Sequence, residues 1–199
     1  MATNNTIEEF NECKVTSAHV KTYDRKTGVL SSEKAKAMGC TGKIETSSEY
    51  KVIVKNCEGV EVKSVKKLVK LTGNISLHMP LSIARTVYGL SNEGLKTGVY
   101  ALSSDSITPD MLFTAKVIDL FSDEEKYICF PKMSITSGFA KSIDNTSEEV
   151  VEVELEFTAY KDENNKFYYE ALKSEVDEAS VGTKWMEEFT PALVKAVSQ

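Results

Sequence analysis

The residues of this sequence that could carry out chemistry are two histidines, four cysteines and one acidic turn. His19 and His78 lie far apart, and each falls in a stretch with the composition of a strand. A Ser–His–Asp or Cys–His site is defined by geometry and could assemble from distant positions, but so few histidines disfavour one. The sequence therefore favours a protein that is not an enzyme.

The four cysteines lack the spacing of a metal or redox site. They are Cys13, Cys40, Cys57 and Cys129, and no two of them form a C-x-x-C pair. Zinc sites and redox motifs need such close pairs. In a reducing compartment we expect free, partly buried thiols, and we expect neither a metal nor a cofactor.

The acidic turn at residues 162–166 (DENNK) could suggest calcium binding. It lacks the regularly spaced oxygen ligands and the closing glutamate of an EF-hand loop, so a solvated hairpin turn is the preferred interpretation. The sequence also contains no G-x-G-x-x-G, P-loop, G-x-S-x-G or H-E-x-x-H motif.

Charge is distributed unevenly along a chain whose net charge is −6. Residues 148–178 hold eleven acidic residues and three lysines, a net charge of −8, whereas residues 51–70 hold six lysines and two glutamates, a net charge of +4. The six lysines are Lys51, Lys55, Lys63, Lys66, Lys67 and Lys70. Either segment alone could be an ordinary solvated strand face. Together they predict complementary surfaces on copies of one protein, arranged head to tail in closed rings.

The clearest predicted strand covers residues 151–159, where apolar and polar residues alternate strictly. The apolar set is Val151, Val153, Leu155, Phe157 and Ala159, and the opposite set is Glu152, Glu154, Glu156 and Thr158. Successive side chains of a strand point to opposite faces. We therefore expect the apolar set in the core and the glutamates on a surface that faces a lumen or an interface.

Similar patterns predict the remaining elements. We expect strands at 14–23, 73–79, 98–103, 112–121 and 126–136, a hairpin over 43–70 with its lysines on the exposed side, and a return strand at 167–172 that pairs with 151–159. Residues 24–42 are expected to form a long loop or extension. Pro80 and Gly89 bound a short helix whose predicted apolar stripe is Leu81, Ala84, Val87 and Tyr88. Residues 184–199 are expected to be a helical tail, interrupted at Pro191.

The length of 199 residues predicts a single domain spanning 1–199. No apolar run approaches the length needed to cross a bilayer. The polar, acidic first ten residues differ from a secretory signal. We expect a mainly β protein that folds in a cytoplasm and has no contact with a membrane.

Two stretches resemble a known family. Residues 127–172 (YICFPKMSITSGFAKSIDNTSEEVVEVELEFTAYKDENNKFYYEAL) combine a strand near Phe130, an SITSGF step, a long amphipathic strand ending in FTAY, an acidic turn and an aromatic return strand. Residues 57–90 (CEGVEVKSVKKLVKLTGNISLHMPLSIARTVYGL) add a strand, a short helix and a closing Gly-Leu. Both stretches resemble the major tail proteins, or tail tube proteins, of bacteriophages with long, non-contractile tails.

This resemblance implies a β-sandwich or barrel-like tail-tube fold with a short flanking α-helix and long extended loops. It implies a structural virion protein that stacks as homo-hexameric rings into a tube for DNA ejection, assembled in the host cytoplasm. The implied partners are the protein itself, a tape measure protein, and tail-tip and terminator proteins, with DNA present only in transit. An acidic lumen would not bind the phosphates of the DNA. Residues 24–42 and 43–70 would be the elements that reach toward neighbouring subunits.

Two alternatives remain, one of a related kind and one from a different class of protein. One is the tube protein of a contractile tail or of a tail-derived bacteriocin, which a neighbouring sheath gene would favour. The other is an adhesive or carbohydrate-binding β-sandwich module, which should carry exposed aromatic residues on loops. The aromatic residues here lie largely within predicted strands.

Overall fold

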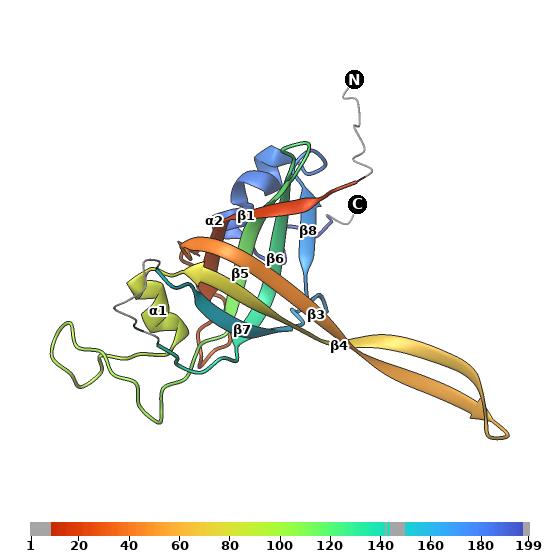
Figure 1. Ribbon diagram of the computed structural model, residues 1–199, viewed down its shortest axis with the longest axis horizontal. Helices are drawn as coiled ribbons and strands as arrows, with labels where there is room; N and C mark the ends of the chain where they lie inside the picture. Colours follow the sequence, from red (N-terminus) through yellow and green to blue (C-terminus); the bar gives the residue numbers. More distant parts are fainter. Residues whose placement is uncertain (1–8, 142, 144–149, 197–199) are drawn as a thin grey trace.

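The computed structural model describes residues 9–141, 143 and 150–196. In this part of the chain eight strands form one antiparallel sheet in the order β2-β1-β5-β6-β7-β4-β3, with β8 paired to β6 beside this path (Figure 1). The strands are β1 (Glu12–Thr22), β2 (Lys36–Ala37), β3 (Cys40–Cys57), β4 (Val60–His78), β5 (Met111–Asp119), β6 (Glu125–Ile135), β7 (Val153–Tyr160) and β8 (Tyr169–Leu172). The helices are α1 (Leu81–Val87), the π-helix η1 (Glu178–Gly182) and α2 (Thr183–Glu188). The predicted mainly β fold with a short helix is confirmed.

β2 covers β1 only at His19 and Val20, and the sheet curls so that β1 approaches the edge strand β3 without pairing with it. The larger core fills the inside of this curl, with side chains from β1, β4, β5, β6, β7 and α1. Ile75, Phe113, Phe130, Leu155 and Phe157 are each at most 1% exposed there. The result is an open barrel with a seam between β1 and β3.

A second core lies on the outer face of β5 and β6, where the C-terminal helices cover the sheet. Trp185 and Phe189 pack there in an edge-on aromatic contact, and Tyr127 stacks on Trp185. The Trp185 indole donates a hydrogen bond to the Ile128 carbonyl over 3.1 Å. β5 and β6 are therefore buried on both faces. The predicted helical tail begins near the expected residue, but α2 ends at Glu188, before Pro191, and residues 197–199 lie outside the described residues.

The predicted hairpin of 112–121 and 126–136 is confirmed as β5 and β6. Asp119 organises its turn, because its carboxylate accepts hydrogen bonds from the backbone N–H groups of Asn11, Phe121 and Ser122. These bonds, the one from Asn11 first, lower the pKa of Asp119 to about 2. The carboxylate thereby ties the start of β1 to the β5–β6 turn.

The return strand differs from its prediction in its partner. β8 pairs with the first half of β6, from Lys126↔Leu172 to Cys129↔Tyr169. β7 pairs with the second half of β6, from Lys132↔Tyr160 to Ile135↔Phe157. The two strands therefore occupy successive parts of one edge of β6, and the prediction that 167–172 pairs with 151–159 is wrong.

Three other predictions also need correction. Residues 98–103 form no strand and contribute only the isolated bridge Ser91↔Ala101, because no neighbouring strand pairs with them. In α1, Ile83 and Val87 are buried whereas Leu81 is 66% exposed, so the predicted stripe is rotated about the helix axis. The separate strand expected at 73–79 is the second half of β4, which runs unbroken from the hairpin.

Residues 24–42 are not a projecting extension. Met38 is fully buried in the larger core, and β2 and the start of β3 fall within this range. The Ala35 N–H donates to the Glu187 carbonyl over 2.8 Å, and the Lys34 ammonium pairs with Glu187 and Glu188 of α2. This segment therefore packs against the body of the subunit.

Candidate functional site

The most prominent feature of the surface is a two-stranded projection that we call the arm, residues 49–70. Beyond Leu71, where pairing with β7 begins, β3 and β4 pair only with each other, and the hairpin extends away from the body (Figure 1). Glu58 and Gly59 close it, both with positive φ (52° and 83°). Positive φ at both central residues is typical of a type I′ turn, whose twist matches that of the strands it joins.

The register assigns the arm's residues to two faces. One face carries Lys51 opposite Lys67, Ile53 opposite Val65, and Lys55 opposite Lys63. The other face carries Tyr50 opposite Leu68, Val52 opposite Lys66, and Val54 opposite Ser64. Both faces are exposed, so the prediction that the lysines share one exposed side is wrong. Four of them do share a face, Lys66 lies on the other face, and Lys70 lies opposite Glu49.

The four-lysine face is electrostatically unfavourable in a single chain. Like charges directly across a strand pair destabilise it, and opposite charges there contribute roughly 0.2–1 kcal/mol. Within the described residues none of the six arm lysines forms an ion pair. This face therefore offers an unneutralised positive surface to another molecule.

Apolar side chains are exposed on the arm as well. Tyr50, Val52 and Val54 on one face are 43–54% exposed, and Ile53 and Val65 on the other are 47% and 46% exposed. A two-stranded hairpin alone is at best marginally stable in water, and it gains stability from a further strand or a packed face. The arm thus has the composition of a surface that a partner covers.

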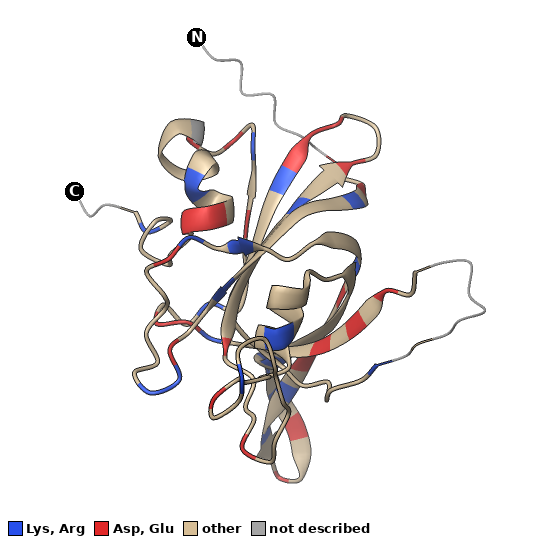
Figure 2. Ribbon diagram, turned by 90° about the vertical axis from the view of Figure 1, so that its left-hand side faces the viewer, with Lys and Arg blue, Asp and Glu red and all other residues tan. Residues whose placement is uncertain are grey.

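The predicted acidic row lies on and just before β7, on the face of the strand opposite the larger core; Figure 2 colours acidic residues red. Glu154 and Glu156 are exposed on β7, and their cross-strand neighbours on β4 are Ser76 and Asn74. Glu152 precedes β7, where its carboxylate lies 3.9 Å from the His78 ring and against Gly42 of β3. The row and the arm lysines do not meet within one chain. Glu148 and Glu149, which also belong to the acidic segment, lie outside the described residues.

The apolar face of the same strand departs from its prediction at one end. Leu155 and Phe157 are buried and Val153 is half-buried, but Val151 is 60% exposed. β4 ends at His78, so no strand remains to pair with residue 151, and its placement in the core is wrong. Thr158, expected on the exposed face, is 4% exposed.

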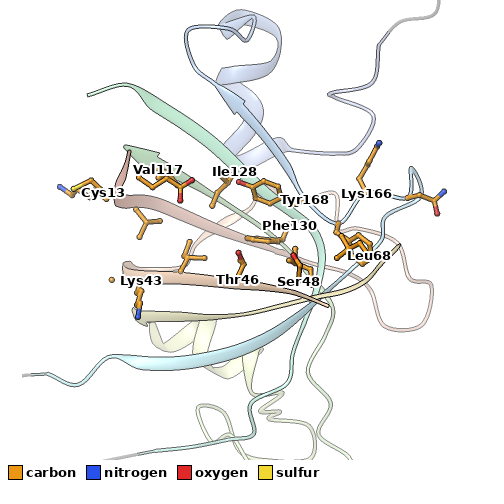
Figure 3. A pocket seen from close by; sticks show the side chains of 18 residues that line it. Cys13, Lys43, Thr46, Ser48, Leu68, Val117, Ile128, Phe130, Lys166 and Tyr168 are labelled. Atoms are coloured by element: carbon orange, nitrogen blue, oxygen red, sulfur yellow. The ribbon is translucent and has the colours of Figure 1, made fainter. Parts of the chain in front are cut away.

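A groove of about 740 Å³ follows the seam between β1 and β3 (Figure 3). Its apolar lining includes Ile44, Leu68, Ile128 and Phe130, and lysines stand at its rim: Lys14, Lys43 and Lys166. It is bordered by two strand edges, because, among the described residues, residues 12–16 of β1 pair only with β5 and β3 pairs only with β4. The groove combines segments more than a hundred residues apart, so sequence patterns gave no signal of it.

Of the remaining candidates for chemistry, the acidic turn is organised by hydrogen bonds and one cysteine is buried. The Asp162 carboxylate accepts hydrogen bonds from the N–H groups of Asn164 and Lys166 and from the Tyr169 hydroxyl, which closes the acidic turn. Burial raises the pKa of the Cys129 thiol well above its usual value, so it stays protonated. The other three cysteines are free and exposed. No group of three or more potential metal ligands occurs among the described residues.

Two comparisons bear on the identity of the chain. No known family matches its sequence, and no curated protein is significantly similar to it. Within the described residues no helix is long and apolar enough to cross a membrane.

Proposed function

We propose that this chain is a structural virion protein that polymerises as stacked, hexameric rings into the tail tube of a bacteriophage with a long, non-contractile tail. The observation that carries the proposal is the arm. The arm is two strands wide and exposed on both faces. Both faces carry exposed apolar side chains, and one face also carries two pairs of facing lysines. An element of this kind gains stability when other copies of the chain cover it.

The outer face of β3, β4 and β7 supports the same function. Two rows of facing residues cross these three strands. One row consists of Lys43, Ser76 and Glu154, and the next consists of Glu45, Asn74 and Glu156. A hydrophilic sheet surface rich in carboxylates repels phosphates, because affinity for DNA depends largely on neutralising them. Such a surface suits the wall of a conduit through which DNA slides without binding.

The resemblance of residues 57–90 and 127–172 to tail tube proteins supplies the remaining support. In this proposal the partners of the chain are other copies of itself, a tape measure protein, and tail-tip and terminator proteins. The protein resides in the virion tail after assembly in the host cytoplasm. DNA passes through the lumen during ejection, and no catalytic step is involved.

Electron microscopy of the purified chain tests the proposal directly. Negatively stained samples at rising concentration should contain rings or tubes of uniform diameter, without added nucleotide, metal or cofactor. The same incubation should be repeated with isolated tail tips as nuclei, which supply a template for polymerisation. A chain that remains monomeric in both experiments contradicts the proposal.

A further inference from the structure

The tip of the arm, residues 56–62, differs from the rest of the arm in charge. It contains Glu58 and Glu61 and no lysine. It also presents Val60 and Val62, which are 65% and 56% exposed. Neither glutamate forms an ion pair within the described chain. The tip therefore combines two exposed valines with two glutamates that form no ion pair among the described residues.

The groove between β1 and β3 has the opposite character. Two of its charged residues are already neutralised, because Lys43 pairs with Glu45 over 2.7 Å and Glu12 pairs with Lys126. Lys14 and Lys166 line the groove without an ion pair among the described residues. The groove thus offers an apolar floor and two free positive charges.

We infer that the arm tip of one copy docks in the groove between β1 and β3 of a second copy. Val60 and Val62 lie over the apolar floor, and the tip glutamates face Lys14 and Lys166. The unpaired edges of β1 and β3 supply backbone donors and acceptors to an inserted hairpin, which is how proteins extend a sheet with an added strand. The inference rests on the proposed self-assembly and names the contact that the arm makes in it.

The arm tip cannot reach the groove of its own chain. Ser48 is the last residue of β3 that lines the groove, and the nine residues from there to Cys57 span about 30 Å as a strand. The arm runs away from the body over that distance (Figure 1). The contact is therefore made only between copies. Because tip and groove are different surfaces, it is a head-to-tail contact, of the type that builds rings or filaments.

Two native cysteines report on this contact. Cys57 lies at the arm tip and Cys13 lines the groove, and both are free and exposed. In a Cys40→Ser background, mild oxidation of assembled protein should produce covalent multimers linked by Cys13–Cys57 disulfides, identified by peptide mass spectrometry. Such a bond requires the two Cα atoms to approach within about 7 Å, so it forms only where tip and groove are in contact.

In the same Cys40→Ser background, chains that keep one exposed thiol beside the buried Cys129 give the matched control. Chains with Cys13→Ser and chains with Cys57→Ser should each remain uncrosslinked. An equimolar mixture of the two should yield covalent dimers and nothing larger, because every bond joins one chain of each kind. Assembly seen by microscopy without Cys13–Cys57 bonds, or with Cys57–Cys57 bonds in their place, overturns this inference and leaves the proposed function standing. Absence of assembly in the same samples overturns the proposed function.

Charge reversal tests the electrostatic part of the contact. The double variant Glu58→Lys/Glu61→Lys should lower the yield of Cys13–Cys57 dimers about tenfold at low salt. Combining it with Lys14→Glu/Lys166→Glu on the groove chain should restore most of that yield. A yield that does not change in either experiment contradicts the pairing of these charges.

Discussion

The replacement of Phe157 by alanine tests the larger core quantitatively. Phe157 lies on β7 with 1% of its surface exposed, and its ring centroid is 5.2 Å from that of Phe130. The ring also occupies the space beside Gly73, where a Cβ would lie 2.7 Å from the ring atoms. Such close packing leaves little room for neighbouring groups to fill a vacated site.

The expected loss follows from this packing. Truncation of a buried phenylalanine to alanine costs about 3–5 kcal/mol, because the transfer free energy of the ring is lost and a cavity remains. Domains are typically stable by about 5–15 kcal/mol. Phe157→Ala should therefore consume a large part of the unfolding free energy, and urea denaturation of the monomer should show a much lower midpoint with little change in slope.

Phe121→Ala is the matched control, because it removes the same atoms from a side chain that is 79% exposed. A surface substitution of this kind should change the unfolding free energy by at most about 0.5 kcal/mol. The two variants are compared in the same buffer at a concentration where the wild type is monomeric. A loss below about 1 kcal/mol for Phe157→Ala would refute the packing described for β7.

Three further predictions concern other parts of the molecule. Gly73→Ala should cost about 1–3 kcal/mol in urea denaturation, because its Cβ would lie 2.2 Å from the Glu45 carbonyl oxygen; wild-type stability would contradict that approach. Asp119, whose pKa is lowered to about 2, should stabilise the fold above about pH 4 and lose this contribution as the pH falls toward 2. The difference in unfolding free energy between wild type and Asp119→Asn should therefore shrink over that interval, and a constant difference would show that the carboxylate charge is not responsible. Lys63→Glu, opposite Lys55, should impair polymerisation in light scattering more than Lys66→Glu on the other face of the arm, and equal effects would argue against the four-lysine face as a contact.

Local patterns predicted those parts of the fold whose partners are close in sequence. The alternation around Leu155 and Phe157 identifies a strand with one buried face, and the polar turn before Glu125 identifies a hairpin. The same alternation extends to Val151, where it misleads, because a strand ends where its neighbour ends and β4 stops at His78. Alternation in the sequence indicates which face of a strand a residue would occupy. Whether the residue belongs to a strand depends on a neighbouring strand to pair with.

Features built from distant segments were beyond local patterns. Residues 98–103 have the composition of a strand, but no strand in the described part of the chain pairs with them. β8 pairs with the first half of β6 because β7 pairs only with the second half of the same edge. The sequence of residues 167–172 does not indicate this. Of the candidate site, the arm was predicted because both of its strands are contiguous. The distribution of its lysines over two faces depends on register shifts near Glu49 and Lys55, which composition does not reveal.

The lysine pairs on the arm also limit aggregation of the free subunit. A long exposed strand edge recruits other edges, and lysines along it are a common means of preventing this. If two arms approached along β3, Lys51, Lys55, Lys63 and Lys67 of each would be brought together without counterions. This repulsion should disfavour the pairing of two arms in a concentrated solution of the protein. In the proposed assembly, the charges that weaken the arm in isolation would thus favour the contact of the arm tip with the groove over contacts between two arms.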